Sequence, residues 1–220
     1  MSMSLVLYTY WRSSAAYRVR IVLNLKGLDY EARPVHLVNE GGEHLKPAYR
    51  AVSPQAQLPT LLDGDRVVRQ SMAIMEYLDE TRPTPALMPV DPAGRAKVRE
   101  LMQAVGADIH PLGNLRVLKA IETEFGADPA AKEAWSRRWI KHGFDGIEQV
   151  MSDGTSGRFS YGDTPTLADA CLVPQFYNAV RWGVDLAPYP TIRRVVEACQ
   201  TLDAFRKAAP EAQPDAPKSM

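Results

Sequence analysis

The sequence of 220 residues is poor in cysteine, with only Cys171 and Cys199. A fold stapled by several disulfides is therefore excluded. Both cysteines lie in stretches that the sequence pattern predicts to be helical. We expect two buried thiols in a reducing compartment, with a disulfide between them as the alternative.

The sequence also lacks net charge and long apolar runs. Its 26 basic and 26 acidic residues cancel, which argues against nucleic-acid binding through bulk charge, although a local basic patch stays possible. No apolar run approaches the ~18–20 residues of a membrane span. Residues 1–4 lack the charged and apolar regions of a signal peptide. We therefore expect a cytoplasmic protein with neither nucleic acid nor membrane as its partner.

Histidine is scarce as well, and no metal site is predicted. The four histidines share no spacing typical of metal ligands; they are His36, His44, His110 and His142.

The first eighty residues alternate strand and helix signals. An apolar strand at 5–8 precedes an amphipathic helix that ends at Gly27, and a strand is predicted at 30–35. A short helix near 44–49 is followed by two strands that flank a turn at 63–65. A further helix is expected to begin with Ser71 as its N-cap. The predicted order is β-α-β-α-β-β-α, which favours a small mixed sheet with helices.

The rest of the chain carries helix signals only. A proline-rich stretch at 83–92 predicts a linker between a domain of residues 1–82 and an all-helical domain of residues 93–220. The expected helices are one long helix at 93–122, one at 130–151, one opened by the capping-box pair Thr166 and Asp169, and one at 190–208. The polar tail at 210–220 is expected to be loose. The fold class is thus α/β followed by all-α.

Two hydroxyl residues, Ser13 and Ser14, stand at the start of the first helix. They fit a helix cap. They also fit an anion site, because the helix start carries unpaired N–H groups and the positive end of the dipole. A serine hydroxyl there could hold a thiolate, and Arg12 beside it could hold a carboxylate. The sequence leaves both interpretations open.

Leu58 and Pro59 open the third predicted strand. A cis peptide bond at this position would turn the chain and leave the backbone of Leu58 open to a ligand, whereas a trans bond is the commoner form. The sequence does not decide between them.

Several of these stretches resemble a known family. Residues 13–21, Ser-Ser-Ala-Ala-Tyr-Arg-Val-Arg-Ile, resemble the signature of zeta-class glutathione transferases, and residues 57–60 with 70–74 resemble the glutathione-binding half of that superfamily. The resemblance runs nearly end to end and includes residues 108–114, 162–174, 184–190 and 213–215. It implies a thioredoxin-like domain followed by a helical bundle domain, in a homodimer. One departure is Ala15, where the zeta signature usually has a cysteine, so thiol chemistry at that position is excluded.

The resemblance implies a glutathione-dependent cis–trans isomerase of a maleyl diacid, either maleylacetoacetate or maleylpyruvate. Glutathione would be recycled, because its thiolate adds to the double bond and leaves again after rotation. One alternative is a zeta-like transferase that conjugates glutathione or dehalogenates small α-haloacids. Another is a non-catalytic binding protein, against which the retention of Ser13, Gln70 and Ser71 argues.

The resemblance also implies roles for individual residues. Ser13 would donate a hydrogen bond to the sulfur, with Ser14 as the runner-up and Arg12 as the third catalytic residue. The residues expected to bind glutathione are Ser13, His44, Gln57, Leu58, Pro59, Gln70, Ser71, His110 and Asn114. The residues expected to bind the diacid substrate are Arg12, Arg116 and Arg181.

Structural alternatives stand beside these roles. His44 fits a solvated surface histidine and His110 a packed, hydrogen-bonded one. Each arginine alone fits a surface salt bridge. Arg18 and Arg20 are expected to serve the structure.

Overall fold

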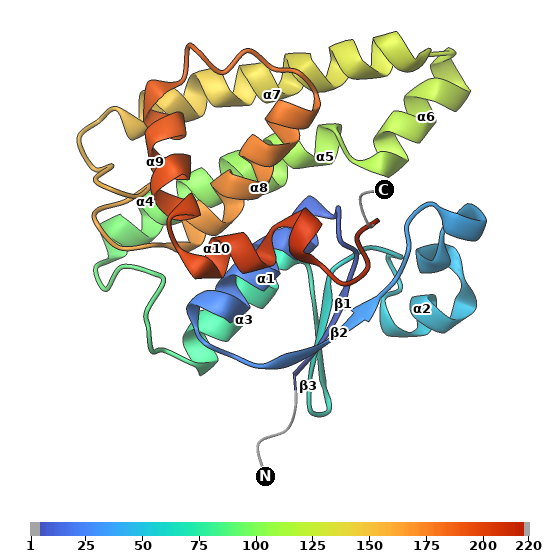
Figure 1. Ribbon diagram of the computed structural model, residues 1–220, viewed down its shortest axis with the longest axis horizontal. Coiled ribbons are helices and arrows are strands. Elements are labelled where there is room, and N and C mark those ends of the chain that lie inside the picture. The colour runs from blue at the N-terminus through green and yellow to red at the C-terminus, as the bar shows by residue number, and fades with distance from the viewer. Residues whose placement is uncertain (1–4, 218–220) are drawn as a thin grey trace. The chain divides into compact units, whose positions relative to one another are not determined.

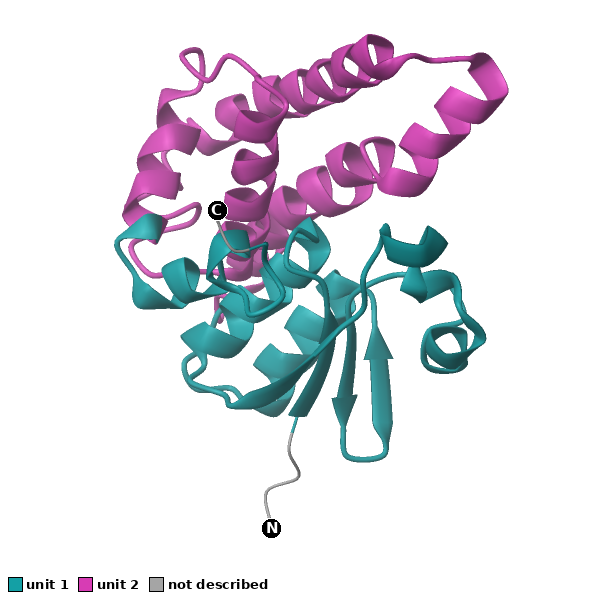
Figure 2. Cartoon of the chain, turned by 45° about the vertical axis from the view of Figure 1, so that its right-hand side comes forward, with its two compact units in different colours: residues 1–87, 200–220 teal, residues 88–199 magenta. Residues whose placement is uncertain are grey.

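The computed structural model describes residues 5–217, so the expectations for residues 1–4 and 218–220 fall outside it. The chain forms two compact units (Figure 2). One contains residues 1–87 and 200–220, and the other contains residues 88–199.

The N-terminal unit has a four-stranded mixed sheet in the order β2-β1-β3-β4. Its elements along the chain are β1 (Leu5–Thr9), α1 (Ser14–Leu25), β2 (Tyr30–Pro34), two short 3-10 turns (Asn39–Gly41 and Glu43–Leu45), α2 (Pro47–Val52), β3 (Thr60–Asp63), β4 (Arg66–Arg69) and α3 (Ser71–Thr81). β1 pairs with β2 in parallel, while β3 pairs antiparallel with both β1 and β4. The predicted order β-α-β-α-β-β-α is confirmed.

Apolar residues on both faces of the sheet build the core of this unit. α1 and α3 lie side by side on one face, and α2 lies on the other (Figure 1). Leu7, Val22, Leu61 and Ile74 are fully buried. Burial of this apolar surface holds the helices on the sheet.

One row of residues crosses the whole sheet near one of its ends. Tyr8 pairs with Arg33 on one side and with Thr60 on the other, and Thr60 pairs with Arg69. The segments that follow β1, β2 and β4, and the segment that precedes β3, therefore leave the sheet at the same end.

The predicted N-cap of α3 is wrong by one residue. Gln70 occupies the cap position with φ of 69°, and Ser71 is the first helical residue. The hydroxyl of Ser71 instead accepts a hydrogen bond from Nη1 of Arg18 at 3.2 Å. The left-handed backbone at Gln70 turns the chain from β4 directly into the helix, so the cap falls one residue early.

Residues 200–217 differ from the expectation in two ways. The helix predicted at 190–208 is two helices, α9 (Pro190–Gln200) and α10 (Asp203–Ala208), because Leu202 is extended between them. The second of these packs on α1, where Asn24 Nδ2 donates to the Ala204 carbonyl at 3.0 Å. The segment after it is hydrogen-bonded rather than loose, since Asp215 accepts from the backbone N–H of Trp11 at 2.9 Å.

The helical unit contains the other long helices. Its elements are α4 (Pro92–Gln103), a π-helix (Ala104–Ile109), α5 (His110–Leu112), α6 (Leu115–Phe125), α7 (Pro129–Met151), α8 (Leu167–Arg181) and α9. α4 packs against α8, and the π-helix packs against α7. Among the described residues, no helix is long and apolar enough to cross a membrane.

The single long helix predicted at 93–122 is interrupted. Asn114 is extended, with φ of −67° and ψ of 146°, and its side chain accepts from the N–H of Arg116 at 3.2 Å. This capping contact begins a new helix, as asparagine favours. The capping box is confirmed, because Asp169 Oδ2 accepts from the N–H of Thr166 at 2.7 Å and from its hydroxyl at 3.0 Å. Cys171 and Cys199 are free and buried, as predicted.

The proline-rich stretch is tied to the N-terminal unit at its first residues. Buried Lys26 pairs with Asp79 at 2.8 Å and donates to the carbonyls of Arg82 and Pro85. Asp79 also accepts from the N–H of Leu87 at 2.8 Å. The chain is therefore fixed until residue 87, where this compact unit ends.

Candidate functional site

Ser13 is the N-cap of α1, so the predicted capping role is confirmed. Its Oγ accepts a hydrogen bond from the N–H of Ala16 at 3.2 Å, and its own N–H donates to the Tyr10 carbonyl at 2.9 Å. The cap uses Oγ as an acceptor, so the hydroxyl hydrogen can still be donated to a ligand. Ser14 is the first helical residue and is half-buried.

The helix start at Ser13 favours an anion. The first turn of α1 contains no acidic residue, and its N–H groups and dipole present positive charge. Arg12 is exposed beside it, and its guanidinium lies 5.4 Å from the centre of the Trp11 ring.

The segment before β3 is held by hydrogen bonds from two hydroxyl side chains. The Leu58–Pro59 peptide bond is cis. The preceding carbonyl, that of Gln57, accepts from the hydroxyls of Tyr49 at 2.7 Å and Ser53 at 3.1 Å. Tyr49 and Ser53 were not among the predicted site residues, because an isolated tyrosine and a serine give no sequence signal for such a contact.

Gln70 and Ser71 lie at the start of α3, next to the same end of the sheet. Gln70 is exposed, and its amide donates to the side-chain oxygen of Gln55 at 2.6 Å. Ser71 is buried against Arg18. A polar, outward-facing amide and a helix N-terminus thus stand together.

His44 lies in the loop that follows β2. Its ring is half-buried against Gly42, whose φ is 103°; a Cβ at Gly42 would lie 2.5 Å from a carbon of the ring. Burial lowers the pKa of His44, and the nearby Arg50 lowers it further. The imidazole is therefore neutral at physiological pH, unless an anion binds beside it.

The N-terminal unit brings together most of the predicted glutathione residues. Tyr8, Thr60 and Arg69 share one row of the sheet, so the chain segments that carry Ser13, Leu58 and Gln70 meet at one end. His44 belongs to the loop after β2, which leaves the sheet at this end as well.

The remaining predicted residues belong to the helical unit. His110 begins α5, Asn114 caps α6, and exposed Arg116 follows two residues later. Arg181 is exposed at the end of α8, with its guanidinium 4.7 Å from the centre of the Trp182 ring.

Helix α7 holds the ends of α5 and α8. Its Trp135 donates from Nε1 to the Leu112 carbonyl at 2.8 Å, and its Arg137 donates to the Trp182 carbonyl at 3.4 Å.

A cavity of about 360 Å³ lies in the helical unit, between α4, the π-helix and α7. Its lining includes Glu100, Asp108, His142 and Asp145, and none of the predicted site residues lines it. The carboxylates of Glu100 and Asp145 are paired with Lys97 and Lys141 respectively. We therefore place the candidate site at the end of the sheet and not in this cavity.

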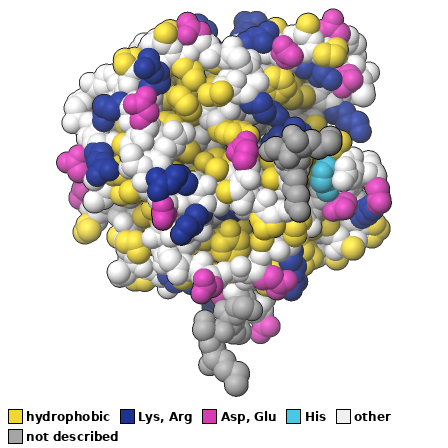
Figure 3. Space-filling view, in the orientation of Figure 1, with side chains coloured by type: hydrophobic (Ala, Val, Ile, Leu, Met, Phe, Trp, Pro, Cys, Tyr) yellow, Lys and Arg dark blue, Asp and Glu magenta, His cyan; other side chains and the backbone are white. Residues whose placement is uncertain are grey.

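Charges on the surface are mixed, and a metal cluster is absent from the described part of the chain. Basic and acidic side chains are interspersed on the face shown in Figure 3. Within residues 5–217, no three histidine, cysteine, aspartate or glutamate side chains are grouped so that they could hold a metal ion.

Comparisons with known proteins identify the family of the chain. The family model described as "Glutathione S-transferase, N-terminal domain" matches residues 7–86. The chain is 54% identical over 210 residues to a maleylpyruvate isomerase of Ralstonia sp, which covers 95% of this chain and 98% of the relative.

Two solved structures show the same architecture. A holo structure of a maleylpyruvate isomerase, described as a bacterial zeta-class glutathione S-transferase, is 54% identical with a TM-score of 0.93, covering 96% of this chain and 100% of the other. A maleylacetoacetate isomerase from Anaeromyxobacter dehalogenans, with dicarboxyethyl glutathione and citrate in its active site, is 47% identical with a TM-score of 0.87 and covers 99% of each chain. At this identity over nearly its whole length, the chain belongs to the zeta class of the glutathione transferase family.

Proposed function

We propose that this chain is a glutathione-dependent cis–trans isomerase of a maleyl diacid, either maleylpyruvate or maleylacetoacetate. The observation that carries the proposal is the hydrogen bonding of Ser13. Its Oγ accepts the capping bond from Ala16 and so keeps its hydrogen for a sulfur atom at the positive end of α1. The names of the two relatives with the same architecture support the reaction.

The residues at the end of the sheet fit glutathione. The backbone of Leu58 pairs with the cysteinyl part, the pair Gln70 and Ser71 holds the γ-glutamyl end at the start of α3, and His44 lies toward the glycyl end. Gln57 and Pro59 shape the turn that presents Leu58. When bound, glutathione supplies the thiolate that adds to the double bond of the substrate and leaves after rotation.

The chain's own work is to keep that sulfur ionised and to stabilise charge. A thiol with a pKa near ~8.5 is mostly protonated at neutral pH, and a hydroxyl donor at a helix N-terminus lowers that pKa. The same donors stabilise negative charge that develops on the substrate. Ser14, one residue further, is the second candidate donor.

The diacid requires cationic groups. We propose that Arg12, Arg116 and Arg181 bind its carboxylates, since guanidinium groups pair with carboxylates in a bidentate geometry. His110 and Asn114, which precede Arg116 in the chain, are proposed to contact glutathione. Arg181→Ala is expected to raise KM for the diacid about tenfold or more with a smaller change in kcat, because it removes a binding group rather than the nucleophile. An unchanged KM would leave Arg181 as a surface residue that contacts Trp182.

The role of Ser13 is tested with three substitutions that separate capping from donation. Ser13→Ala loses both the cap and the donor, Ser13→Asp keeps a cap but has no hydroxyl and adds negative charge, and Ser13→Thr keeps both. We expect kcat to fall about 10–1000-fold in Ser13→Ala, and at least as far in Ser13→Asp, while Ser13→Thr keeps most of it.

A matched control removes a cap elsewhere. Asp128 caps α7 by accepting from the N–H of Ala131 at 2.7 Å, so Asp128→Ala loses a comparable cap without touching the proposed site. Its activity is expected to stay at the wild-type level. If Ser13→Asp isomerised the substrate as fast as the wild type, the hydroxyl would have no role and the proposal would fail.

The choice between substrates and between reaction types is decided by one assay. The absorbance of maleylpyruvate or maleylacetoacetate is followed with glutathione at catalytic concentration, and the substrate with the higher kcat/KM is the one that the enzyme prefers. Stoichiometric consumption of glutathione would instead favour the alternative, a zeta-like transferase that conjugates glutathione or dehalogenates small α-haloacids. That alternative has less support, because Arg116 and Arg181 favour a diacid substrate over a neutral electrophile.

We also propose that the chain is a cytoplasmic homodimer. Buried free thiols support a reducing compartment, and the resemblance to the zeta class supports the dimer. Residues 1–82 would hold glutathione, and the helical domain predicted at residues 93–220 would bind the diacid together with Arg12. Light scattering of the purified chain is expected to give twice its 24.4 kDa, and a monomer mass would contradict the dimer.

A further inference from the structure

The segment of residues 10–13, which carries Ser13, is held by side chains from other parts of the chain. β1 ends at Thr9, and its pairing with β2 and β3 does not extend to residues 10–13. Within the segment, the N–H of Ser13 donates to the Tyr10 carbonyl. The cap on α1 holds Ser13 from one side, and the path of residues 10–12 that leads into Ser13 depends on contacts from other parts of the chain.

The first such contact is Arg20, which is fully buried in α1. Its guanidinium donates to the carbonyls of Tyr10 at 3.2 Å and Trp11 at 3.0 Å, and to the hydroxyl of Thr9 at 3.1 Å. The same group donates through Nε to the carbonyl of Ala208 at 3.0 Å. Burial lowers the pKa of Arg20 to about 10, so it remains charged at neutral pH. Arg20 thus joins the segment before Ser13 to the end of α10.

The second contact is Asp215. Its carboxylate accepts the backbone N–H of Trp11 at 2.9 Å. The turn that carries it is fixed by Gln213, whose amide donates to the carbonyls of Lys207 and Ala209, each at 2.9 Å. The N–H of Trp11 is therefore held by Asp215, which lies 204 positions further along the chain, while the carbonyl of Trp11 is held by Arg20.

We propose that Asp215 is a positioning residue for Ser13, and that residues 208–215 hold the segment of residues 10–12 that precedes it. This inference rests on the proposed function, because it concerns where the Ser13 hydroxyl stands. Asp215 would act through the Trp11 peptide, whose N–H it accepts, two residues before Ser13.

The expected effect follows from the geometry. Without the carboxylate, the Trp11 peptide loses the hydrogen bond to its N–H and keeps the one from Arg20 to its carbonyl, so the segment can rotate about the remaining bond. A displacement of the order of 1 Å at a reacting group costs about a hundredfold in rate, so we expect Asp215→Ala to lower kcat about 10–100-fold. The ionisation of the sulfur should also weaken, which moves the acid limb of the pH–rate profile to higher pH.

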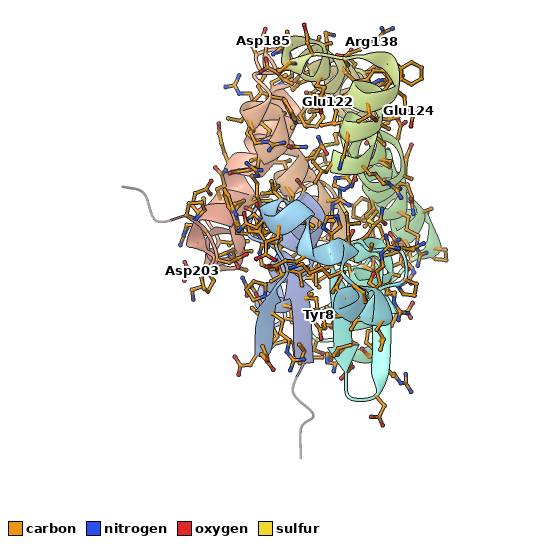
Figure 4. All side chains as sticks on the ribbon, turned by 90° about the vertical axis from the view of Figure 1, so that its right-hand side faces the viewer. Tyr8, Glu122, Glu124, Arg138, Asp185 and Asp203 are labelled. Atoms are coloured by element: carbon orange, nitrogen blue, oxygen red, sulfur yellow. The ribbon has the colours of Figure 1, made fainter. Side chains whose placement is uncertain are left out.

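The experiment compares three variants. Asp215→Ala removes the acceptor, whereas Asp215→Asn keeps an oxygen in the same place and is expected to retain most of kcat. Asp185→Ala is the matched control, because exposed Asp185 likewise accepts a backbone N–H, that of Ala187 at 3.0 Å, in the loop after α8 (Figure 4). It should change neither kcat nor the pH profile.

Amide hydrogen exchange of a peptide spanning residues 10–14 gives a readout without catalysis. Exchange is expected to be faster in Asp215→Ala than in the wild type, and unchanged in Asp185→Ala. Should Asp215→Ala not fold, Asp215→Glu, which moves the acceptor by one methylene, is expected to show the same changes in smaller degree.

The outcomes separate the two proposals. A wild-type chain that does not isomerise either substrate would overturn the proposed function, whatever the variants do. An active wild type together with an unaltered pH profile and unaltered exchange in Asp215→Ala would overturn the positioning role alone. A lower melting temperature with unchanged kinetics would also overturn it, because that result describes a purely structural contact.

Discussion

Two glycines of α7 offer a sharp test of the packing beside His110. Gly143 lies against Ile109, the last residue of the π-helix, which is 2% exposed. A Cβ at Gly143 would lie 2.1 Å from Cγ1 and 2.2 Å from Cδ1 of Ile109, whereas a Cβ at Gly146 would meet nothing within 4 Å. The same substitution, glycine to alanine, should therefore stabilise the chain at Gly146, whereas at Gly143, one turn away, this gain is opposed by an overlap with Ile109.

The magnitude can be worked out from two opposing contributions. Alanine inside a helix is favoured over glycine by about 0.5–1 kcal/mol, and at Gly146 that gain stands alone. At Gly143 an overlap with a buried side chain costs about 1–3 kcal/mol. The two variants should thus differ by about 1–3 kcal/mol in the free energy of unfolding, which corresponds to about 2–4 °C in Tm for each kcal/mol in a chain of this size.

Thermal unfolding of both variants, followed by circular dichroism, measures this difference. Gly146→Ala is expected to melt above the wild type and Gly143→Ala below Gly146→Ala. In a double-mutant cycle, Ile109→Ala should cost less in the Gly143→Ala background than in the wild type, with a coupling of about 1–3 kcal/mol. Equal melting temperatures for the two alanine variants, or additive effects in the cycle, would refute the close approach of α7 to Ile109.

Two further predictions concern the N-terminal unit. Asp79→Ala leaves the fully buried Lys26 ammonium without its carboxylate and should lower the free energy of unfolding by about 3–5 kcal/mol, measured by urea unfolding. Glu31→Ala, which removes an exposed partner of Arg33, should leave the urea midpoint unchanged, and similar midpoints for the two variants would contradict this prediction. The pKa of His44 is lowered by burial and by Arg50, so on acidification the unfolded chain takes up a proton at His44 at a higher pH than the folded chain does. The folded state therefore has its full stability above pH 6.5 and loses part of it as the pH falls toward the pKa of His44 in the folded chain. His44→Gln should therefore show a smaller loss of Tm between pH 7.5 and 5.5 than the wild type, and parallel losses would count against a depressed pKa.

The order of elements in the N-terminal unit could be predicted because its signals are local. Alternating apolar periods and the turn at 63–65 each involve residues within a few positions of one another, as does the capping box at Thr166 in the helical unit. The break before α6 was missed, because the helical period continues through Gly113 and Asn114. The cap of α3 was misplaced, since a left-handed glutamine is uncommon and gives no pattern of its own.

The hydrogen bonds that hold the segment before Ser13 could not be predicted for a different reason. Asp215 meets Trp11 across 204 positions, and Arg20 meets Ala208 across 188. Hydrogen bonds between such distant segments leave no periodicity, and a polar stretch with prolines is typical of a loose tail. Arg20 was correctly expected to serve the structure, but the parts that it joins become evident only once α10 is placed on α1.

Ser13 shows how a structural and a functional interpretation can hold together. The sequence left open whether this serine caps a helix or binds an anion, as if one role excluded the other. Capping uses a lone pair of Oγ, while holding a thiolate uses the hydroxyl hydrogen, so both contacts fit one side chain. The cap also fixes the direction in which that hydrogen is available, because the bond to Ala16 restricts rotation of the side chain. The helix cap is thus the means by which the donor is oriented. Ser13→Thr and Ser13→Asp both keep a cap, so a difference in activity between them reports on the exchange of the hydroxyl donor for a negative charge.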